Sequence, residues 1–153
     1  MSDPILFDNT TPRFGLPNLY PGQAQKEFFI NEAAYLTDLF LHPAVEAELG
    51  APPSNPATGQ MWLVGEIASG DWQGNEGKIA IREEDGWRFF EPVDGLRLFD
   101  KSSQQFLLMS GQWYRATAPT LPTTGITIDT ELRSAFTNLI EALRNAGIFS
   151  VSG

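Results

Sequence analysis

The sequence predicts an α+β fold that is mainly β: a small antiparallel β meander, closed as a barrel or a sandwich, with a helix on each side. Three observations predict this class. Short apolar runs alternate with turn residues across residues 44–116, a helical apolar pattern precedes this region, and a second helical pattern follows it. The 153 residues suffice for one domain with appendages and an ordinary hydrophobic core.

Residues 1–22 are predicted to form an extended N-terminal arm. Prolines at four positions fix the backbone and bias the preceding residues towards extended conformations. Two alternatives are open: the arm wraps the core of its own chain, or it reaches into a neighbouring subunit. Its apolar anchors are Ile5, Leu6, Phe7, Phe14, Leu16, Leu19 and Tyr20.

A helix is predicted within residues 23–42. It begins at Gln23 or Gln25, and Pro43 ends it. Its apolar residues recur three and four positions apart, which is the spacing of one helical face. They are Phe29, Ala33, Leu36 and Phe40.

Residues 44–116 are predicted to form five to seven short strands, and the clearest hairpin turns at Asp85-Gly86. This dipeptide favours a type I′ turn, because both residue types tolerate a positive φ. In the resulting register Glu83 lies opposite Arg88 and Ile81 opposite Phe90. Both sheet faces then carry large apolar groups: Ile79, Ile81 and Phe90 on one, and Trp87 and Phe89 on the other, with Arg82 over an aromatic ring.

A second hairpin is predicted over residues 96–110, followed by a turn at Gly111 into a last strand. Either Ser110-Gly111 or Gly111-Gln112 forms the centre of that turn, so its register stays open. Residues 117–127 are rich in threonine and proline and are predicted to be a linker.

The last segment, residues 128–147, predicts an amphipathic helix. Asp129 or Thr127 caps its start, and Gly147 stands where a C-terminal glycine belongs. A helix this short is marginally stable alone, so it docks either on its own β domain or on symmetry mates. A heptad seam runs along it, formed by Leu132, Phe136, Leu139, Leu143 and Ala146.

Composition excludes several classes of function. The net charge is −9 with no run of lysine or arginine, which predicts no nucleic-acid partner. Apolar runs are far shorter than a bilayer requires, which predicts no membrane insertion. The absence of cysteine excludes disulfides and thiolate chemistry. The N-terminus lacks the pattern of a signal peptide, so we expect synthesis in the cytoplasm.

No catalytic, cofactor or metal site is predicted. His42 is the only histidine, and it is interpreted as a residue at a helix C-terminus. Glu83 and Glu84 point to opposite faces of a strand and do not form a carboxylate pair. Oxygen ligands in the glycine-rich loop at 71–76 do not have the spacing of a calcium loop.

The predicted binding residues are aromatic and apolar. Trp62 and Trp113 are interpreted mainly as core residues, and Trp87 is open between core and contact. Trp72 lies between glycines in a loop and is the indole best suited to contact a ligand such as a sugar. The interface candidates are Trp72, Trp87, Phe89, Arg82, Trp113, Phe14, Leu16, Leu19, Tyr20, Leu132, Phe136, Leu139 and Leu143.

Several motifs resemble, in order, a domain-of-unknown-function family found in prophages and gene transfer agents of alphaproteobacteria. They are Leu16-Pro17, then Gly-Gln-Ala-Gln-Lys at residues 22–26, then Asn-Glu-Ala at residues 31–33. The resemblance continues through "APPSNPATGQMWLVG", "GDWQGNEGKIAI" and "GWRFFEPVDGLRLF" and ends near "GQWYRA", so it covers roughly residues 11–115.

The resemblance implies a structural component of a phage-like particle: an oligomeric adaptor or base of a head spike or tail fibre that takes part in host-cell attachment. The implied partners are further copies of the chain, other capsid, spike or fibre proteins, and cell-surface polysaccharide. The implied location is the assembled particle released by lysis. The alternative function is a carbohydrate-binding module that recognises polysaccharide on the host surface.

Overall fold

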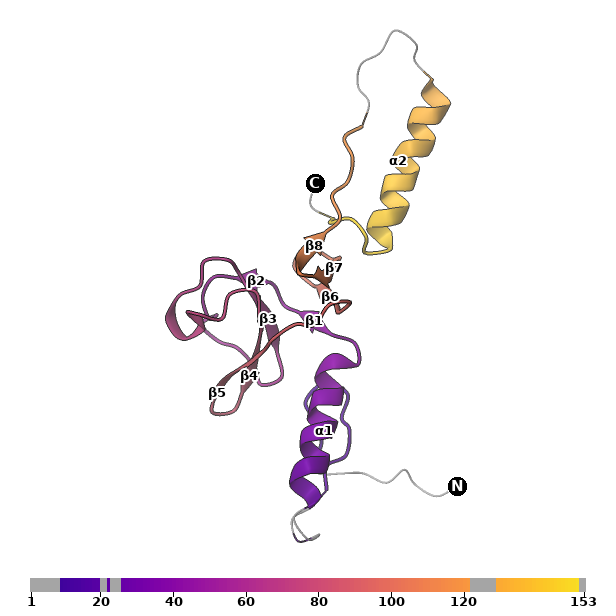
Figure 1. The fold of residues 1–153 in the computed structure, drawn as a ribbon. Helices are drawn as coiled ribbons and strands as arrows, with labels where there is room; N and C mark the ends of the chain where they lie inside the picture. Colours follow the sequence, from indigo (N-terminus) through magenta and orange to yellow (C-terminus); the bar gives the residue numbers. More distant parts are fainter. Residues whose placement is uncertain (1–8, 20–21, 23–25, 122–128, 152–153) are drawn as a thin grey trace, which may run out of the picture.

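In the computed structural model, the described residues form two four-stranded sheets and two α-helices (Figure 1). The structure describes residues 9–19, 22, 26–121 and 129–151. The predicted α+β class is confirmed, and the described residues form no closed barrel. In chain order the elements are α1 (Lys26–Phe40), β1 (Ala44–Val45), β2 (Glu48–Leu49), β3 (Met61–Val64), the 3₁₀ helix η1 (Gly70–Trp72), β4 (Ile79–Glu83), β5 (Gly86–Phe90), β6 (Arg97–Asp100), β7 (Gln105–Ser110), β8 (Gln112–Arg115) and α2 (Thr130–Asn145).

One short segment, residues 44–49, belongs to both sheets. Its first half, β1, pairs with β6 in the first sheet, whose strand order is β1-β6-β7-β8. Its second half, β2, pairs with β3 in the second sheet, whose strand order is β2-β3-β4-β5. Between them, the amide of Glu46 donates to the carbonyl of Met61 at 2.8 Å. Both pairings of this segment are parallel, unlike the predicted antiparallel pairing, which holds for the other strand pairs of the described residues. The reason is that a strand entering from α1 runs along both sheets instead of turning back.

The β4–β5 hairpin has the predicted faces but a different register. Ile81 lies opposite Arg88 and Arg82 opposite Trp87, a shift of two residues from the prediction. A shift of two keeps every side chain on its face, because the side-chain period of a strand is two. The turn residues Glu84 and Asp85 do not take the positive φ of a type I′ turn. The Arg82 guanidinium lies 5.7 Å from the Trp87 ring and donates to the Gly86 carbonyl, contacts that favour the observed register.

The turn between β7 and β8 consists of Gly111 alone. Ser110 pairs directly with Gln112, and Gly111 has a φ of 70°, which glycine adopts without strain. The register left open by the sequence is therefore neither of the two considered.

The second sheet is buried on both of its faces. One face packs against the first sheet and α1, in a core that includes Leu39, Val45, Leu63, Ile79, Leu98 and Leu107. The other face forms a separate core of Trp62, Val64, Trp72 and Ala80, with Trp87 and Phe89 packed against it. This confirms the expectation of large apolar groups on both faces of the hairpin.

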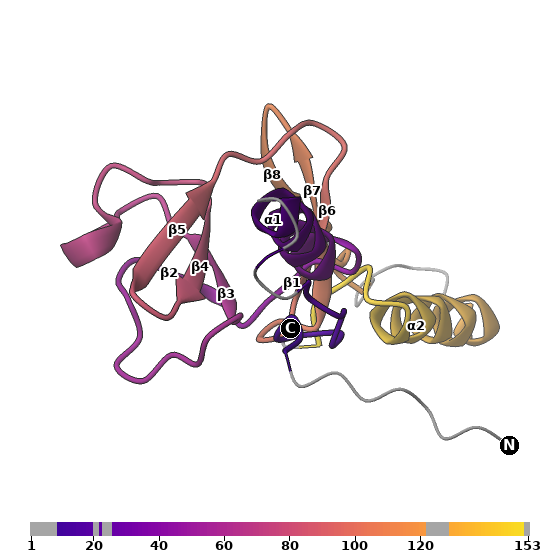
Figure 2. The same ribbon diagram turned by 90° about the horizontal axis from the view of Figure 1, so that it is seen from below.

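α2 stands apart from the sheets. Figures 1 and 2 show the second sheet on one side of the molecule, the first sheet in the middle and α2 beyond it. Asp129, one of the two predicted caps, caps the helix by accepting from the Leu132 amide at 2.8 Å. At the other end, Gly147 has a φ of 71° and its amide donates to Arg144, while the Ile148 amide donates to Leu143. These two bonds form a Schellman motif, so the C-terminal glycine is also confirmed.

Candidate functional site

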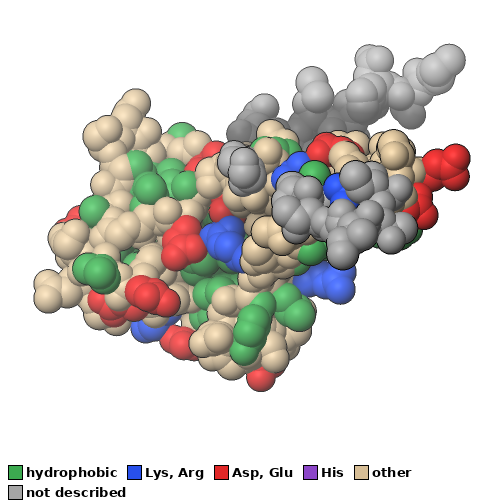
Figure 3. Space-filling model, turned by 90° about the horizontal axis from the view of Figure 1, so that it is seen from above, with side chains coloured by type: hydrophobic (Ala, Val, Ile, Leu, Met, Phe, Trp, Pro, Cys, Tyr) green, Lys and Arg blue, Asp and Glu red, His purple; other side chains and the backbone are tan. Residues whose placement is uncertain are grey.

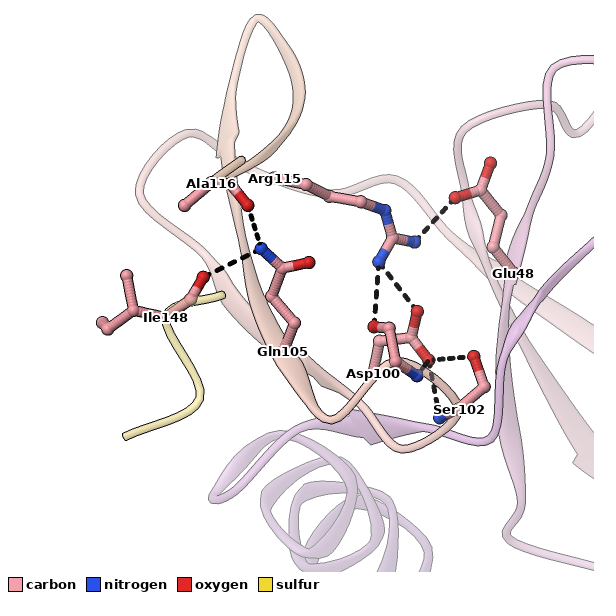
Figure 4. A network of polar contacts seen from close by, with 8 residues as sticks. Glu48, Asp100, Ser102, Gln105, Arg115, Ala116 and Ile148 are labelled. Carbon is pink, nitrogen blue, oxygen red and sulfur yellow. Dashed lines mark hydrogen bonds and ion pairs between the residues drawn. The ribbon is translucent and has the colours of Figure 1, made fainter. Parts of the chain in front are cut away.

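A network of charged side chains connects strands β6 and β8 of one sheet to strand β2 of the other (Figure 4). Arg115 on β8 donates to Asp100 on β6 and to Glu48 on β2, each at 2.7 Å. Asp100 is only 2% exposed and also accepts from the hydroxyl of Ser102 at 2.7 Å. A single guanidinium therefore binds one carboxylate from each sheet.

The network shifts the pKa values of its members. Burial alone would raise the pKa of Asp100, but hydrogen bonds from Ser102 and Arg115 outweigh it and hold this pKa below its usual value. Burial would lower the pKa of Arg115, but its bonds to Glu48 and Asp100 outweigh burial and raise it. Both groups are held in their charged forms.

An open cleft of about 670 Å³ lies over this network and is bordered by both sheets. Gln105 borders it too, and its amide nitrogen donates to the carbonyls of Ala116 and Ile148, which ties the segment following α2 to β7. The charged groups of Asp100 and Arg115 are thus engaged with one another, and the arrangement fastens the two sheets and the C-terminal segment. Among the described residues, no group of three or more His, Cys, Asp or Glu side chains is placed to hold a metal ion.

A second polar contact fastens the N-terminal arm to α1. The buried carboxylate of Asp38 accepts from the amides of Arg13 and Phe14. The Arg13 guanidinium in turn donates to the carbonyl of Leu39, in the last turn of the helix, and to that of His42, just beyond its end. The described part of the arm is therefore folded onto its own chain.

This arm is not extended throughout, which corrects the prediction for its described part. Thr10 and Pro17 form an antiparallel bridge, and the chain turns between them. The reason is local: Thr11 and Leu16 exchange hydrogen bonds across the turn. Phe14 is exposed with its ring 5.8 Å from that of His42, Leu16 and Leu19 are half-buried, and Tyr20 lies outside the described residues.

A third polar contact joins α1 to the β4–β5 hairpin. Arg88 binds Glu32 on α1 and Glu83 on β4, the latter at 3.5 Å. The bond from Arg88 lowers the pKa of Glu32, and the same bond raises the pKa of Arg88. Beside them, burial raises the pKa of Tyr35 to about 12. The predicted ion pair between Glu83 and Arg88 is present, although diagonal across the strands.

The tryptophans form an interior cluster. The Trp72 ring lies 5.0 Å from that of Trp87 and 6.4 Å from that of Trp62, with edge-on or tilted geometry. Trp72 is 0% exposed, because the glycine-rich loop folds η1 back over the sheet. The expectation that it is the indole best suited to meet a ligand is therefore corrected, because its side chain is fully buried beside two other indoles.

The remaining predicted binding residues on the strands are half-buried and pack against one of the two cores. Arg82, Trp87 and Phe89 are half-buried around the indole cluster. Trp113 is half-buried, packs against the core between the sheets, and donates from its indole nitrogen to the Gly77 carbonyl at 2.8 Å. All four tryptophans lie among the described residues, and none of them is exposed.

The predicted seam on α2 is largely open to solvent. Leu132 is 65% exposed and Leu139 is 53% exposed, while Phe136 and Leu143 are half-buried. Ile140, beside the seam, is the buried residue of the helix. Within the described residues, the helix contacts the first sheet only at its C-terminal end. There Gly147 lies so close to β7 that a Cβ atom added to it would stand 3.1 Å from the Phe106 ring.

Sequence reasoning missed a second exposed apolar surface, at the start of α1. Phe28 is 71% exposed and Phe29 is 73% exposed, with their rings edge to face at 5.7 Å, and Ile30 is exposed beside them. The signal was present, since three consecutive apolar residues at 28–30 exceed what one buried helical face accommodates. On the face shown in Figure 3, acidic and basic side chains lie next to one another, with apolar side chains in separate patches around them.

The geometry defines a small two-sheet α+β module with exposed apolar surfaces on both helices. The sequence profile of a family described as "Protein of unknown function (DUF2793)" matches residues 30–115, more than half of the chain. The chain therefore belongs to this family. The match contains all eight strands and the Asn-Glu-Ala motif at 31–33, whereas the Leu16-Pro17 motif, the residues at 22–26 and α2 lie outside it.

Comparison with curated proteins found no match, and neither did comparison with solved structures. Among the described residues, neither helix has the length and apolar character needed to cross a bilayer.

Proposed function

We propose that this protein is a structural component of a phage-like particle or gene transfer agent. In this proposal it is an oligomeric adaptor or base of a head spike or tail fibre, and it takes part in host-cell attachment. It carries out no catalysis and binds its neighbours through apolar surfaces. Its motifs support the particle setting by their resemblance to proteins of prophages and gene transfer agents, and its structure supports the mode of action.

The observation that carries the mode of action is the distribution of exposed apolar side chains. The second sheet buries its large apolar side chains in two cores, whereas the helices leave large ones open at Phe28 and Phe29 on α1 and at Leu132 and Leu139 on α2. Exposed apolar groups of this size, gathered on elements that project from a folded body, are typical of surfaces that meet other proteins.

The alternative of a carbohydrate-binding module receives no comparable support. That function needs exposed indole or phenol rings beside polar groups. The indoles are half-buried or buried here, and three of them pack against one another. The exposed phenol of Tyr114 lies beside Phe106 and Leu108, in a hollow whose border is mainly apolar but also includes Arg97 and Arg115.

The experiment is to purify the DNase-resistant particles released by the source strain on lysis and to quantify this chain in them by mass spectrometry. We expect several copies per particle, enriched together with the capsid and tail proteins through a density gradient. A ribosomal protein serves as the control and should be depleted in the same fractions. If the chain is depleted as strongly as the ribosomal protein, the proposal is wrong.

A further inference from the structure

One face of α2 is built from two parallel rows of apolar residues. Leu132 and Leu139 form a row of large side chains, and Ala135 and Ala142 form a row of small ones beside it. Residues seven apart lie on the same side of a helix, so each row runs along the axis. All four residues are exposed. We call this surface, Leu132, Ala135, Leu139 and Ala142, the α2 face.

The chain's own sheets do not cover the α2 face. The helix is fixed at its C-terminal end, where the Phe106 amide donates to the Gly147 carbonyl at 2.7 Å and Gln105 donates to Ile148. From that point α2 extends away from the sheets (Figure 1). Its buried residue, Ile140, lies on a different side of the helix from the α2 face. Laying the α2 face on the first sheet would require breaking this anchored turn.

We propose that the α2 face pairs with the same face of a second copy, with the two helices antiparallel. The inference deepens the proposed function and rests on it in one respect, that the chain assembles with itself. In this arrangement Leu132 comes level with Ala142 of the second copy, and Ala135 with its Leu139. Each large side chain then meets a small one, which lets ridges fit into grooves along the whole contact.

Charge favours a second copy and fixes the orientation. α2 carries Glu131 and Glu141 against Arg133 and Arg144, so its net charge is zero, whereas the whole chain carries −9. The acidic body lies at the C-terminal end of the helix (Figure 1). An antiparallel pair places the two bodies at opposite ends, about 24 Å apart at 1.5 Å per residue. This exceeds the Debye length of about 8 Å at physiological salt. A parallel pair would bring the two acidic bodies side by side.

The first test measures the mass of the full chain by sedimentation equilibrium between about 1 and 200 µM, a range that spans the micromolar affinities expected of a small interface. We expect the mass to rise from 16.9 kDa towards twice that value with concentration. Leu139→Glu buries a charge in the pair, so its dissociation constant should be at least about tenfold higher. Thr137→Glu adds the same charge on the opposite, exposed side of α2 and should leave the dissociation constant unchanged.

The second test measures orientation, and it uses the absence of native cysteine. The double variant Leu132→Cys/Ala142→Cys should form a covalent dimer on mild oxidation. Leu132→Cys alone should not, because in the antiparallel pair its two copies lie ten residues apart, about 15 Å, beyond the reach of a disulfide. Circular dichroism of each variant confirms that α2 still folds.

A chain that stays monomeric at 200 µM, or a dimer unaffected by Leu139→Glu, overturns the pairing. Cross-linking of the Leu132→Cys single variant overturns its antiparallel orientation. If the chain forms a stable oligomer that Leu139→Glu does not weaken, the proposed pairing is wrong but the adaptor function is not contradicted. If the chain is absent from particles, the adaptor function is wrong but the pairing is not contradicted.

Discussion

The outer face of the second sheet and the α2 face are both rich in apolar side chains, yet their burial is opposite. On the sheet, the rings of Trp62 and Trp87 pack against each other and against Trp72, which belongs to η1. On α2, Leu132 and Leu139 face solvent. The difference lies in the path of the neighbouring chain: a glycine-rich loop returns over the sheet, while α2 is held only at its end. The first surface stabilises the fold, and the second is available to a partner.

The largest effect should come from opening the indole cluster. Trp72→Ala removes a fully buried ring and leaves a cavity, so we expect the free energy of unfolding to fall by about 3–5 kcal/mol. Urea unfolding followed by tryptophan fluorescence measures this loss. Val93→Ala, at an exposed position, is the matched control and should change the free energy by less than about 0.5 kcal/mol. If the two variants were equally stable, Trp72 would not be a core residue.

A sharper form of the comparison uses one residue type in both regions. Leu63→Ala, in the core between the sheets, should cost about 2–5 kcal/mol. Leu139→Ala in dilute solution should cost less than about 1 kcal/mol, since its side chain is already half in water. Thermal unfolding at 1 µM compares the two. A large cost at Leu139 under these conditions would mean that it is covered within its own chain.

The charged network should make stability depend on pH. The folded pKa of Asp100 is depressed, so its contribution is fully present above its unfolded value near 3.9 and is lost as pH falls through the folded pKa. Asp100→Asn should cost about 2 kcal/mol at pH 7 and flatten the pH dependence of unfolding below about pH 4. Glu32→Gln removes another carboxylate with a lowered pKa and serves as the comparison, with a smaller change because that group is more exposed. If the free energy of unfolding of Asp100→Asn fell with decreasing pH as steeply as that of the native protein, Asp100 would not be the source of the pH dependence.

The smallest effect should come from the cap of α2. Asp129→Ala removes the acceptor for the Leu132 amide and should lower helix stability by about 1 kcal/mol. Amide hydrogen exchange localises the change: protection should fall in the first turn of α2 and stay the same in β3 and β4. Equal loss in the sheets would show that α2 and the sheets unfold as one unit.

Local chemistry made the helices and hairpins predictable. Asp129 and Gly147 marked both ends of α2, and alternation placed Ile81 and Trp87 on opposite faces of their hairpin. Long-range contacts were beyond this reasoning. The two-residue strands β1 and β2 are too short to carry a pattern, and the burial of Trp72 depends on where a loop returns. No local pattern around Asp38 predicts that it binds the arm, and none around Arg115 predicts that it connects the two sheets.

The segment at 44–49 also sets an order of events for folding. It is bound to β3 nearby and to β6 much further along, and its ion pair between Glu46 and Lys101 spans 55 residues. During synthesis at roughly 5–20 residues per second, the chain waits several seconds between making this segment and making its second partner. Its free edge is exposed for that interval, and closing such a long loop is slow. A nascent chain of which only the residues before 97 have left the ribosome would therefore have its second sheet formed and its first sheet incomplete, and that chain should be an early substrate for chaperones.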